Sequence, residues 1–181
     1  MSAIIRLDIV LHETVDTAYR DLVTRPTGAA VRHGVITVLR DLPDDHAELD
    51  FSEVGVMDFS CADEVVAKLL VETFGLQFPR LRLRGVRDDH AEAIEFALAR
   101  YDLVMVAVLT SSPEPRLLGS APEDWRAAFR TLTRLGRAAA PPVADLLAWP
   151  VERTTDALQG LASRHCVVQH PDATFELRAV A

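Results

Sequence analysis

Residues 46–75 of the chain, HAELDFSEVGVMDFSCADEVVAKLLVETFG, decide its fold. The first part predicts a buried strand, in which Ala47, Leu49 and Phe51 alternate with more polar residues. A tight loop around Gly55 follows, and residues 58–74 then carry the apolar spacing of an amphipathic helix. Its expected inward residues are Val65, Val66, Leu69, Leu70 and Phe74. Because open α/β sheets usually place their sites at the carboxyl ends of strands, this turn is the first candidate for a functional site.

This stretch resembles the centre of the STAS domain, the fold of the anti-sigma factor antagonists. The family signature is an apolar strand ending in Asp, followed by an apolar-Asp-Ser-Ser-Gly turn into a helix. The matching residues are Leu49, Asp50, Val54, Val56, Met57, Asp58 and Ser60. Phe59 stands where the first Ser of the turn would be, and Cys61 replaces the usual Gly. With Ala-Asp-Glu at 62–64 opening the helix, the turn and residues 25–32 look like a divergent STAS-like branch.

The resemblance implies an α/β fold and a role in signal relay through protein binding. It places Ser60 where the antagonists carry their phosphoacceptor serine, and it implies a partner that resembles an anti-sigma kinase-like ATPase. The expected contact surface consists of Asp50, Asp58, Phe59, Asp63 and Glu64. A phosphate at Ser60 would be repelled by the neighbouring carboxylates, which suits a switch that breaks binding. The alternative is that Ser60 only caps the helix, because a Ser before acidic residues is also an ordinary N-cap arrangement.

Charge is unevenly distributed over the 181 residues, whose net charge is −8. Residues 1–118 hold 12 Arg and Lys against 20 Asp and Glu, whereas residues 119–181 hold 7 against 7. An acidic first part favours a protein partner over nucleic acid or an anionic membrane, although acidity can also serve solubility alone. The start of the chain lacks a basic leader with a long apolar block and no run reaches transmembrane length, so we expect a cytoplasmic protein.

The remaining patterns up to residue 109 predict one compact STAS-like domain, residues 1–109. The expected elements are a strand at 3–11, a helix at 27–42, a strand at 81–86, a helix at 88–101 and a strand at 103–109. The sequence TSSPEPRLLGSAP follows, and its Ser, Pro and Gly content predicts a linker or ordered tether over residues 110–121.

Residues 122–181 predict three helices, at 122–135, 140–149 and 151–161, and then two strands at 166–169 and 174–179. This order is similar to a winged helix-turn-helix domain, although a generic helical tail remains an alternative. The resemblance implies DNA contacts from Arg153, Thr154 and Arg164 on or near the third helix and from His170 near the ribbon tip. Residues 119–181 have no net charge, so we rank binding of a protein by this domain slightly above binding of DNA. A DNA-binding transcriptional regulator is the alternative function.

Nothing in the sequence favours catalysis. The His residues lack metal spacing, and neither a glycine-rich phosphate loop nor a GxSxG elbow is present. Cys61 and Cys166 lie far apart in the chain and are expected to be reduced thiols. The carboxylates of Asp50, Glu53, Asp58, Asp63 and Glu64 could hold a divalent cation, but capping, solvation or partner contact is favoured. The sequence therefore predicts a non-enzymatic regulator without metal or cofactor.

Overall fold

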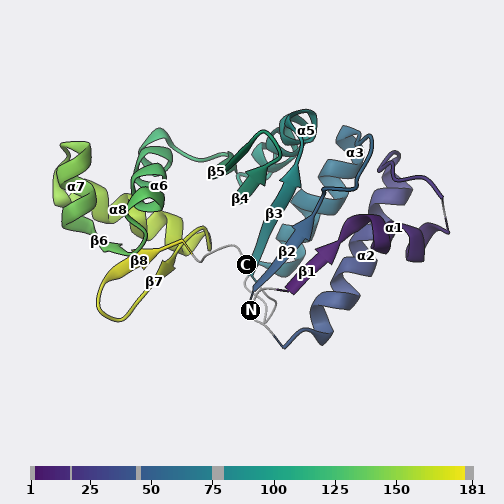
Figure 1. Cartoon of the computed structure of the whole chain (residues 1–181), viewed down its shortest axis with the longest axis horizontal. Helices are drawn as coiled ribbons and strands as arrows, with labels where there is room; N and C mark the ends of the chain where they lie inside the picture. The colour runs from purple at the N-terminus through teal and green to yellow at the C-terminus, as the bar shows by residue number, and fades with distance from the viewer. Residues whose placement is uncertain (1–2, 17, 44–45, 75–79, 178–181) are drawn as a thin grey trace.

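The computed structural model describes residues 3–16, 18–43, 46–74 and 80–177. These residues form a mixed α/β structure with a five-stranded sheet, followed by helices and a small three-stranded antiparallel sheet (Figure 1). The α/β fold class predicted from the sequence is confirmed at this level. Among the described residues, no helix combines the length and the hydrophobicity that a membrane span requires.

The five-stranded sheet has the order β1-β2-β3-β4-β5, in which β1 to β4 are parallel and β5 is antiparallel to β4. Its strands are β1 Ala3–Arg6, β2 His46–Asp50, β3 Arg80–Val86, β4 Val104–Leu109 and β5 Ser112–Gly119. The predicted strands at 46–51, 81–86 and 103–109 correspond to β2, β3 and β4. Because the strands follow one another in chain order, every crossover runs in the same direction and places its helices on the same face of the sheet.

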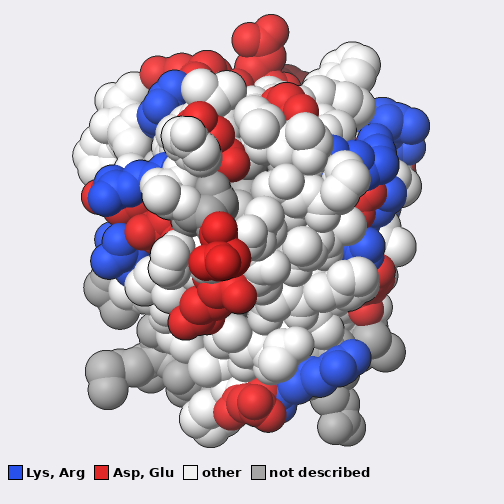
Figure 2. Space-filling view, turned by 90° about the vertical axis from the view of Figure 1, so that its right-hand side faces the viewer, with Lys and Arg blue, Asp and Glu red and all other residues white. Residues whose placement is uncertain are grey.

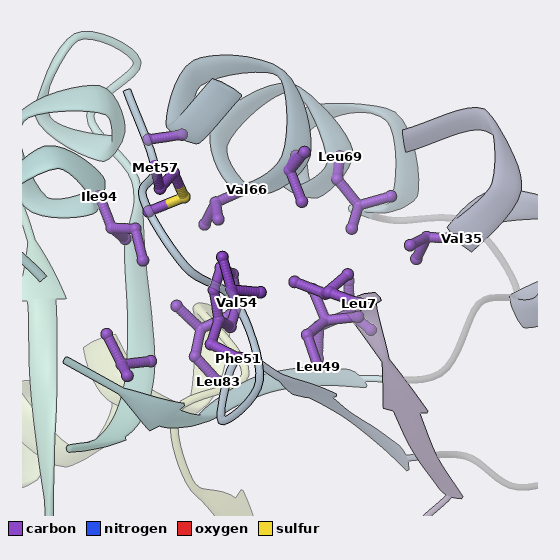
Figure 3. Packing of buried hydrophobic residues seen from close by; sticks show 14 of the residues in the cluster. Leu7, Val35, Leu49, Phe51, Val54, Met57, Val66, Leu69, Leu83 and Ile94 are labelled. Atoms are coloured by element: carbon purple, nitrogen blue, oxygen red, sulfur yellow. The ribbon is translucent and has the colours of Figure 1, made fainter. Parts of the chain in front are cut away.

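The helices of this part pack on that face and enclose the main core (Figures 1 and 3). They are α1 Leu7–Val15, α2 Arg25–Asp41, α3 Phe59–Ala62, the π-helical segment η1 Asp63–Lys68, α4 Leu69–Thr73 and α5 Asp88–Ala99. In Figure 3, Leu49 and Leu83 rise from the strands, and Phe51 from the residue after β2, toward Val66 and Leu69 of the helix above them. Alternate strand residues supply the core because successive side chains point to opposite faces of a sheet.

The α3–η1–α4 helix lies at the centre of the helical layer and is more deeply buried than an amphipathic stripe predicts. Five consecutive residues, 63–67, are buried. Helix α2 contacts η1 on one side and α5 contacts it on the other. The predicted inward positions Val65, Val66 and Leu69 are confirmed. Phe74 was predicted to face the core, but its side chain is exposed.

The second half of the described chain packs on the opposite face of the sheet, over β4 and β5 (Figure 1). Its elements are α6 Glu123–Leu135, β6 Ala138–Ala139, α7 Ala140–Leu147, α8 Val151–Ser163, β7 Val168–Gln169 and β8 Thr174–Glu176. Val104 and Val106 of β4 and Leu117 of β5 join Phe129 and Leu132 of α6 in a second hydrophobic cluster. The two halves of the chain therefore share a core across the sheet.

The three predicted helices and the hairpin of the second half are present. The strand β6 was not predicted, and it pairs with β8 in a sheet of order β6-β8-β7. Residues 178–179 of the predicted last strand lie outside the described residues.

The predicted strand at 3–11 is wrong beyond Arg6, because helix α1 begins at Leu7. Leu7, Val10 and Leu11 are buried, whereas Ile9 is exposed. This spacing of three and four residues is typical of one face of a helix. The sequence was interpreted as a strand because Ile5, Leu7 and Ile9 also alternate with other residues. Helix α2 likewise starts at Arg25, with Pro26 in its first turn rather than before it.

The linker predicted at residues 110–121 is also corrected, because Ser112–Gly119 forms β5 and pairs with β4. Pro113 and Pro115 suggested a break in structure. Strand β5 lies at the edge of the sheet, and proline is tolerated in edge strands because its missing N–H can face away from the partner strand.

Surface charge is mixed on the end of the molecule that carries α1 and α2. Figure 2 shows acidic side chains down the middle of this end and basic side chains toward both edges of the view. This view offers no broad basic area.

Candidate functional site

The loop between β2 and α3 is held by hydrogen bonds to two neighbouring segments. The amide of Leu22 donates to the Val56 carbonyl at 2.8 Å, and the Asp58 amide donates to the Leu22 carbonyl at 3.0 Å. On the other side, the His90 ring nitrogen Nε2 lies 2.7 Å from the Gly55 carbonyl oxygen. These contacts fix the position at which the helix begins.

Asp58 is the N-cap of α3, so Ser60 is not the capping residue. Asp58 Oδ1 accepts hydrogen bonds from the Cys61 amide and the Ser60 hydroxyl, both at 2.8 Å, and its Oδ2 accepts one from the Thr24 amide at 2.9 Å. Burial alone would raise the pKa of Asp58. The hydrogen bonds from Thr24, Cys61 and Ser60 outweigh it and hold the pKa below its ordinary value. Asp58 is therefore a charged cap.

Ser60 lies in the first turn of the helix and is half-buried. Its hydroxyl donates a hydrogen bond to the Asp58 carboxylate. The predicted candidates Ser60 and Asp58 are thus brought into direct contact. A group added to the Ser60 oxygen would break this hydrogen bond and lie next to a negative charge.

Asp63 and Glu64 are 1% and 2% exposed, so the prediction that these two side chains contact a partner is wrong. Both accept a hydrogen bond from Arg25 Nη1, at 2.8 Å and 2.7 Å. Lys68 also pairs with both, and Glu64 further contacts Arg32. Burial would raise the pKa of each carboxyl, but the hydrogen bonds and positive charges of this cluster lower it. The carboxylates therefore tie η1 to α2 instead of facing outward.

Asp50 lies apart from this cluster. Its Oδ1 accepts a hydrogen bond from the Ser52 amide at 2.9 Å, and its Oδ2 lies 3.6 Å from Arg84 on the neighbouring strand. Asp50 thus belongs to the polar face of the sheet, opposite the helices, together with the Arg residues of β3. The structure does not bring Asp50 together with Ser60.

Phe59 contributes to an apolar surface that the sequence patterns did not reveal as a whole. Its ring makes an edge contact with Phe96 of α5, with ring centroids 5.1 Å apart, and Phe96 is 65% exposed. Arg100 lies over the Phe59 ring at 5.7 Å. The signal for Phe96 was available in principle, because this position falls on the outward stripe of the predicted helix at 88–101.

Both thiols are buried and belong to separate parts of the structure. Burial raises the pKa of Cys61 to about 12 and that of Cys166 to about 12. Neither is therefore a ready nucleophile at neutral pH. Within the described ranges, no three His, Cys, Asp or Glu side chains gather in a way that could hold a metal ion.

The residues predicted to contact DNA are largely engaged inside the protein. Thr154 is fully buried, and its hydroxyl donates to the Pro150 carbonyl, so the prediction of a DNA contact from its side chain is wrong. Arg153 forms two hydrogen bonds with Asp124, at 2.8 Å and 2.6 Å, and stacks on Trp149.

The other two candidates also have partners within the chain. Arg164 donates to the Asp102 carbonyl at 2.8 Å and thereby bridges the two halves. His170 Nε2 lies 3.2 Å from Glu176.

Comparison of the chain with protein-family models, with curated proteins and with solved structures finds no match.

Proposed function

We propose that this chain is a non-enzymatic regulatory protein that relays a signal by binding a protein partner at the start of α3, and that phosphorylation of Ser60 releases the partner. The observation that carries the proposal is the half-buried Ser60 hydroxyl, which donates to the charged cap Asp58 beside the Phe59 ring. The partner expected from the STAS resemblance is an ATPase similar to the anti-sigma kinases, which would also supply the phosphate.

The electrostatics support a switch that weakens binding. A phosphoserine carries about 1.5 to 2 negative charges at neutral pH, and its oxygen cannot donate to Asp58 as the hydroxyl does. Arg25, a cation of the buried cluster, already pairs with Asp63 and Glu64. Modification would therefore disturb the cap, whose loss typically costs about 1 kcal/mol of helix stability, and would change the charge next to Phe59.

The test is binding of the full chain to a candidate histidine-kinase-like ATPase, measured by calorimetry. We expect Ser60→Glu to weaken binding at least tenfold and Ser60→Ala to retain it. Ser163→Glu is the matched control, because Ser163 is exposed at the end of α8 and the substitution adds the same charge. Equal affinity of the wild type and Ser60→Glu would refute the switch.

DNA binding by the second half is the second candidate. The order α6-β6-α7-α8 followed by a two-stranded ribbon favours it, since a winged helix places its third helix in the major groove. The Arg153–Asp124 pair and the exposed Glu152 and Asp156 on α8 oppose it, because carboxylates repel phosphates.

A DNA-binding chain would shift genomic duplexes at low salt, with an affinity that decreases steeply as salt increases and decreases again on Arg153→Ala. If no duplex shifts at low salt, the proposal that the second half binds DNA is refuted.

A further inference from the structure

The outward face of α5 carries an apolar cleft with an acidic edge. Asp89, Glu92, Ala93 and Phe96 follow the helical spacing of three and four residues, and together with Phe59 they line a cavity of about 370 Å³. The inward residues of the same helix, Ala91, Ile94, Ala97 and Leu98, are buried in the core. Helix α5 therefore carries apolar side chains on two sides, and only the inward side is covered by the core.

Phe96 makes this cleft unlike the scattered exposed apolar residues that are normal on protein surfaces. At 65% exposure it presents most of a large ring to water, and its contact with Phe59 joins two aromatic side chains from different helices. Phe59 is half-buried and Phe96 is exposed. Aromatic side chains are enriched in protein interfaces, where a side chain of the partner completes the packing.

The charges around the cleft indicate which partner fits it. Glu92 is exposed, and within the described residues no ion pair engages it. Asp89 pairs with Arg87 at 2.5 Å on one edge, and Arg100 lies over Phe59 on the other. Because Arg100 Nη1 also lies 4.0 Å from the buried Asp63, Glu92 is the charge beside the rings that no described ion pair engages, within a part of the chain whose net charge is −8.

We infer that this cleft binds an amphipathic segment of a partner protein in which an apolar or aromatic side chain packs against the Phe59 and Phe96 rings and a Lys or Arg pairs with Glu92. A second copy of the chain fits less well, because a two-fold contact would bring Glu92 and Asp89 of one copy toward the same residues of the other. This inference rests on the proposed function only in assigning a protein partner to this side of the molecule.

The test uses a labelled 16-residue amphipathic peptide of Lys, Ala and Leu with one central Trp, and a matched peptide in which Glu replaces every Lys. Fluorescence anisotropy with the full chain measures both affinities. We expect the basic peptide to bind at least tenfold more tightly than the acidic one. We expect Phe96→Ala and Glu92→Lys each to weaken its binding about tenfold or more.

Two control variants separate the cleft from general effects. Leu146→Ala removes a side chain of α7 that is also 65% exposed, and Glu152→Lys reverses an exposed charge on α8. Both should leave peptide affinity within about twofold, and thermal unfolding checks that all four variants are folded. Equal losses in the controls, or equal affinity for the acidic peptide, would overturn the inference. Sedimentation that shows a dimer abolished by Phe96→Ala would overturn it in favour of a second copy.

The same variants distinguish this inference from the phosphorylation switch. If Ser60→Glu releases the ATPase while Phe96→Ala changes neither ATPase nor peptide binding, the switch stands and the cleft is refuted. If Phe96→Ala and Glu92→Lys abolish peptide binding while Ser60→Glu leaves ATPase binding intact, the cleft stands and the switch is refuted.

Discussion

At the scale of single residues, Glu48 is the carboxylate least well accommodated by the fold. It lies on the polar face of the sheet at 2% exposure, and among the described residues neither of its oxygens has a hydrogen-bond partner. Arg84 approaches it only to 3.6 Å. Burial therefore raises the pKa of Glu48, against the opposing effect of Arg84 and Arg82. A buried carboxylate that has an ion pair at this distance but no hydrogen bond reduces the stability of the folded chain.

The raised pKa gives this position a defined pH dependence. The folded chain holds the Glu48 proton more tightly than the unfolded chain does, so its contribution to stability is greatest below the ordinary pKa and decreases as pH rises through the raised one. We expect Glu48→Gln to raise the melting temperature by a few degrees at pH 7 and to have little effect at pH 4. Calorimetry at both pH values, with the exposed Glu152→Gln as control, checks this. A lower melting temperature at pH 7 would mean that attraction to Arg84 outweighs burial.

At the scale of elements, the close approach of α2 to α3 depends on Gly28. A Cβ atom at this position would lie 2.9 Å from Glu64 Cβ and 3.1 Å from the backbone Cα of Cys61. The same approach lets Arg25 and Arg32 of α2 reach the buried carboxylates of η1. Gly28 thus allows the ion pairs that compensate the cost of burying the carboxylates of Asp63 and Glu64.

We expect Gly28→Ala to lower the free energy of unfolding by about 1 kcal/mol, because overpacking outweighs the gain in helix propensity. Gly34→Ala in the same helix is the control. Its Cβ would lie 2.7 Å from a methyl group of Thr14 and 2.7 Å from one of Val10, and both are side-chain atoms of α1 that can shift without moving a backbone. Urea unfolding measures both variants. A larger loss for Gly34→Ala than for Gly28→Ala would contradict the role of this approach.

At the scale of the whole molecule, Arg126 of α6 links the two halves. Its guanidinium donates to the carbonyls of Leu117 and Gly119 at 2.7 Å each and to that of Ala121 at 3.2 Å, and it pairs with Glu95 of α5. A single side chain therefore hydrogen-bonds the carbonyl groups at the end of β5 and holds the second half against the sheet.

We expect Arg126→Met to lower the free energy of unfolding by about 2 kcal/mol, because three carbonyls lose a charged donor. Arg130→Met, one turn further along α6, removes only an exposed pair with Glu123 and should change stability by less than about 0.5 kcal/mol. Thermal unfolding followed by circular dichroism gives both values. Equal effects of the two substitutions would show that Arg126 is not a link of this kind.

Local patterns correctly predicted those elements in which the spacing of the apolar residues and the residues at the two ends indicate the same type of secondary structure. Strand β3 and helix α5 are examples, since Leu81 and Leu83 of β3 are buried at a period of two and the buried residues of α5 follow a period of three to four. Strand β5 was missed because Ser and Pro obscure an edge strand that exists through its pairing with β4. In the candidate site, Asp58, Phe59 and Ser60 were found from one contiguous turn, whereas Phe96 lies on a different element.

The sequence by itself determined the α/β class, most of the element order and the turn at which helix α3 begins, because these depend on residues close together in the chain. Only the tertiary structure decided that Asp63 and Glu64 are internal, that Thr154 is buried, and that Phe96 joins Phe59 at the surface. These properties depend on contacts between segments far apart in the chain. Which face of a helix remains exposed to a partner is therefore determined only when the rest of the chain has packed against its other faces.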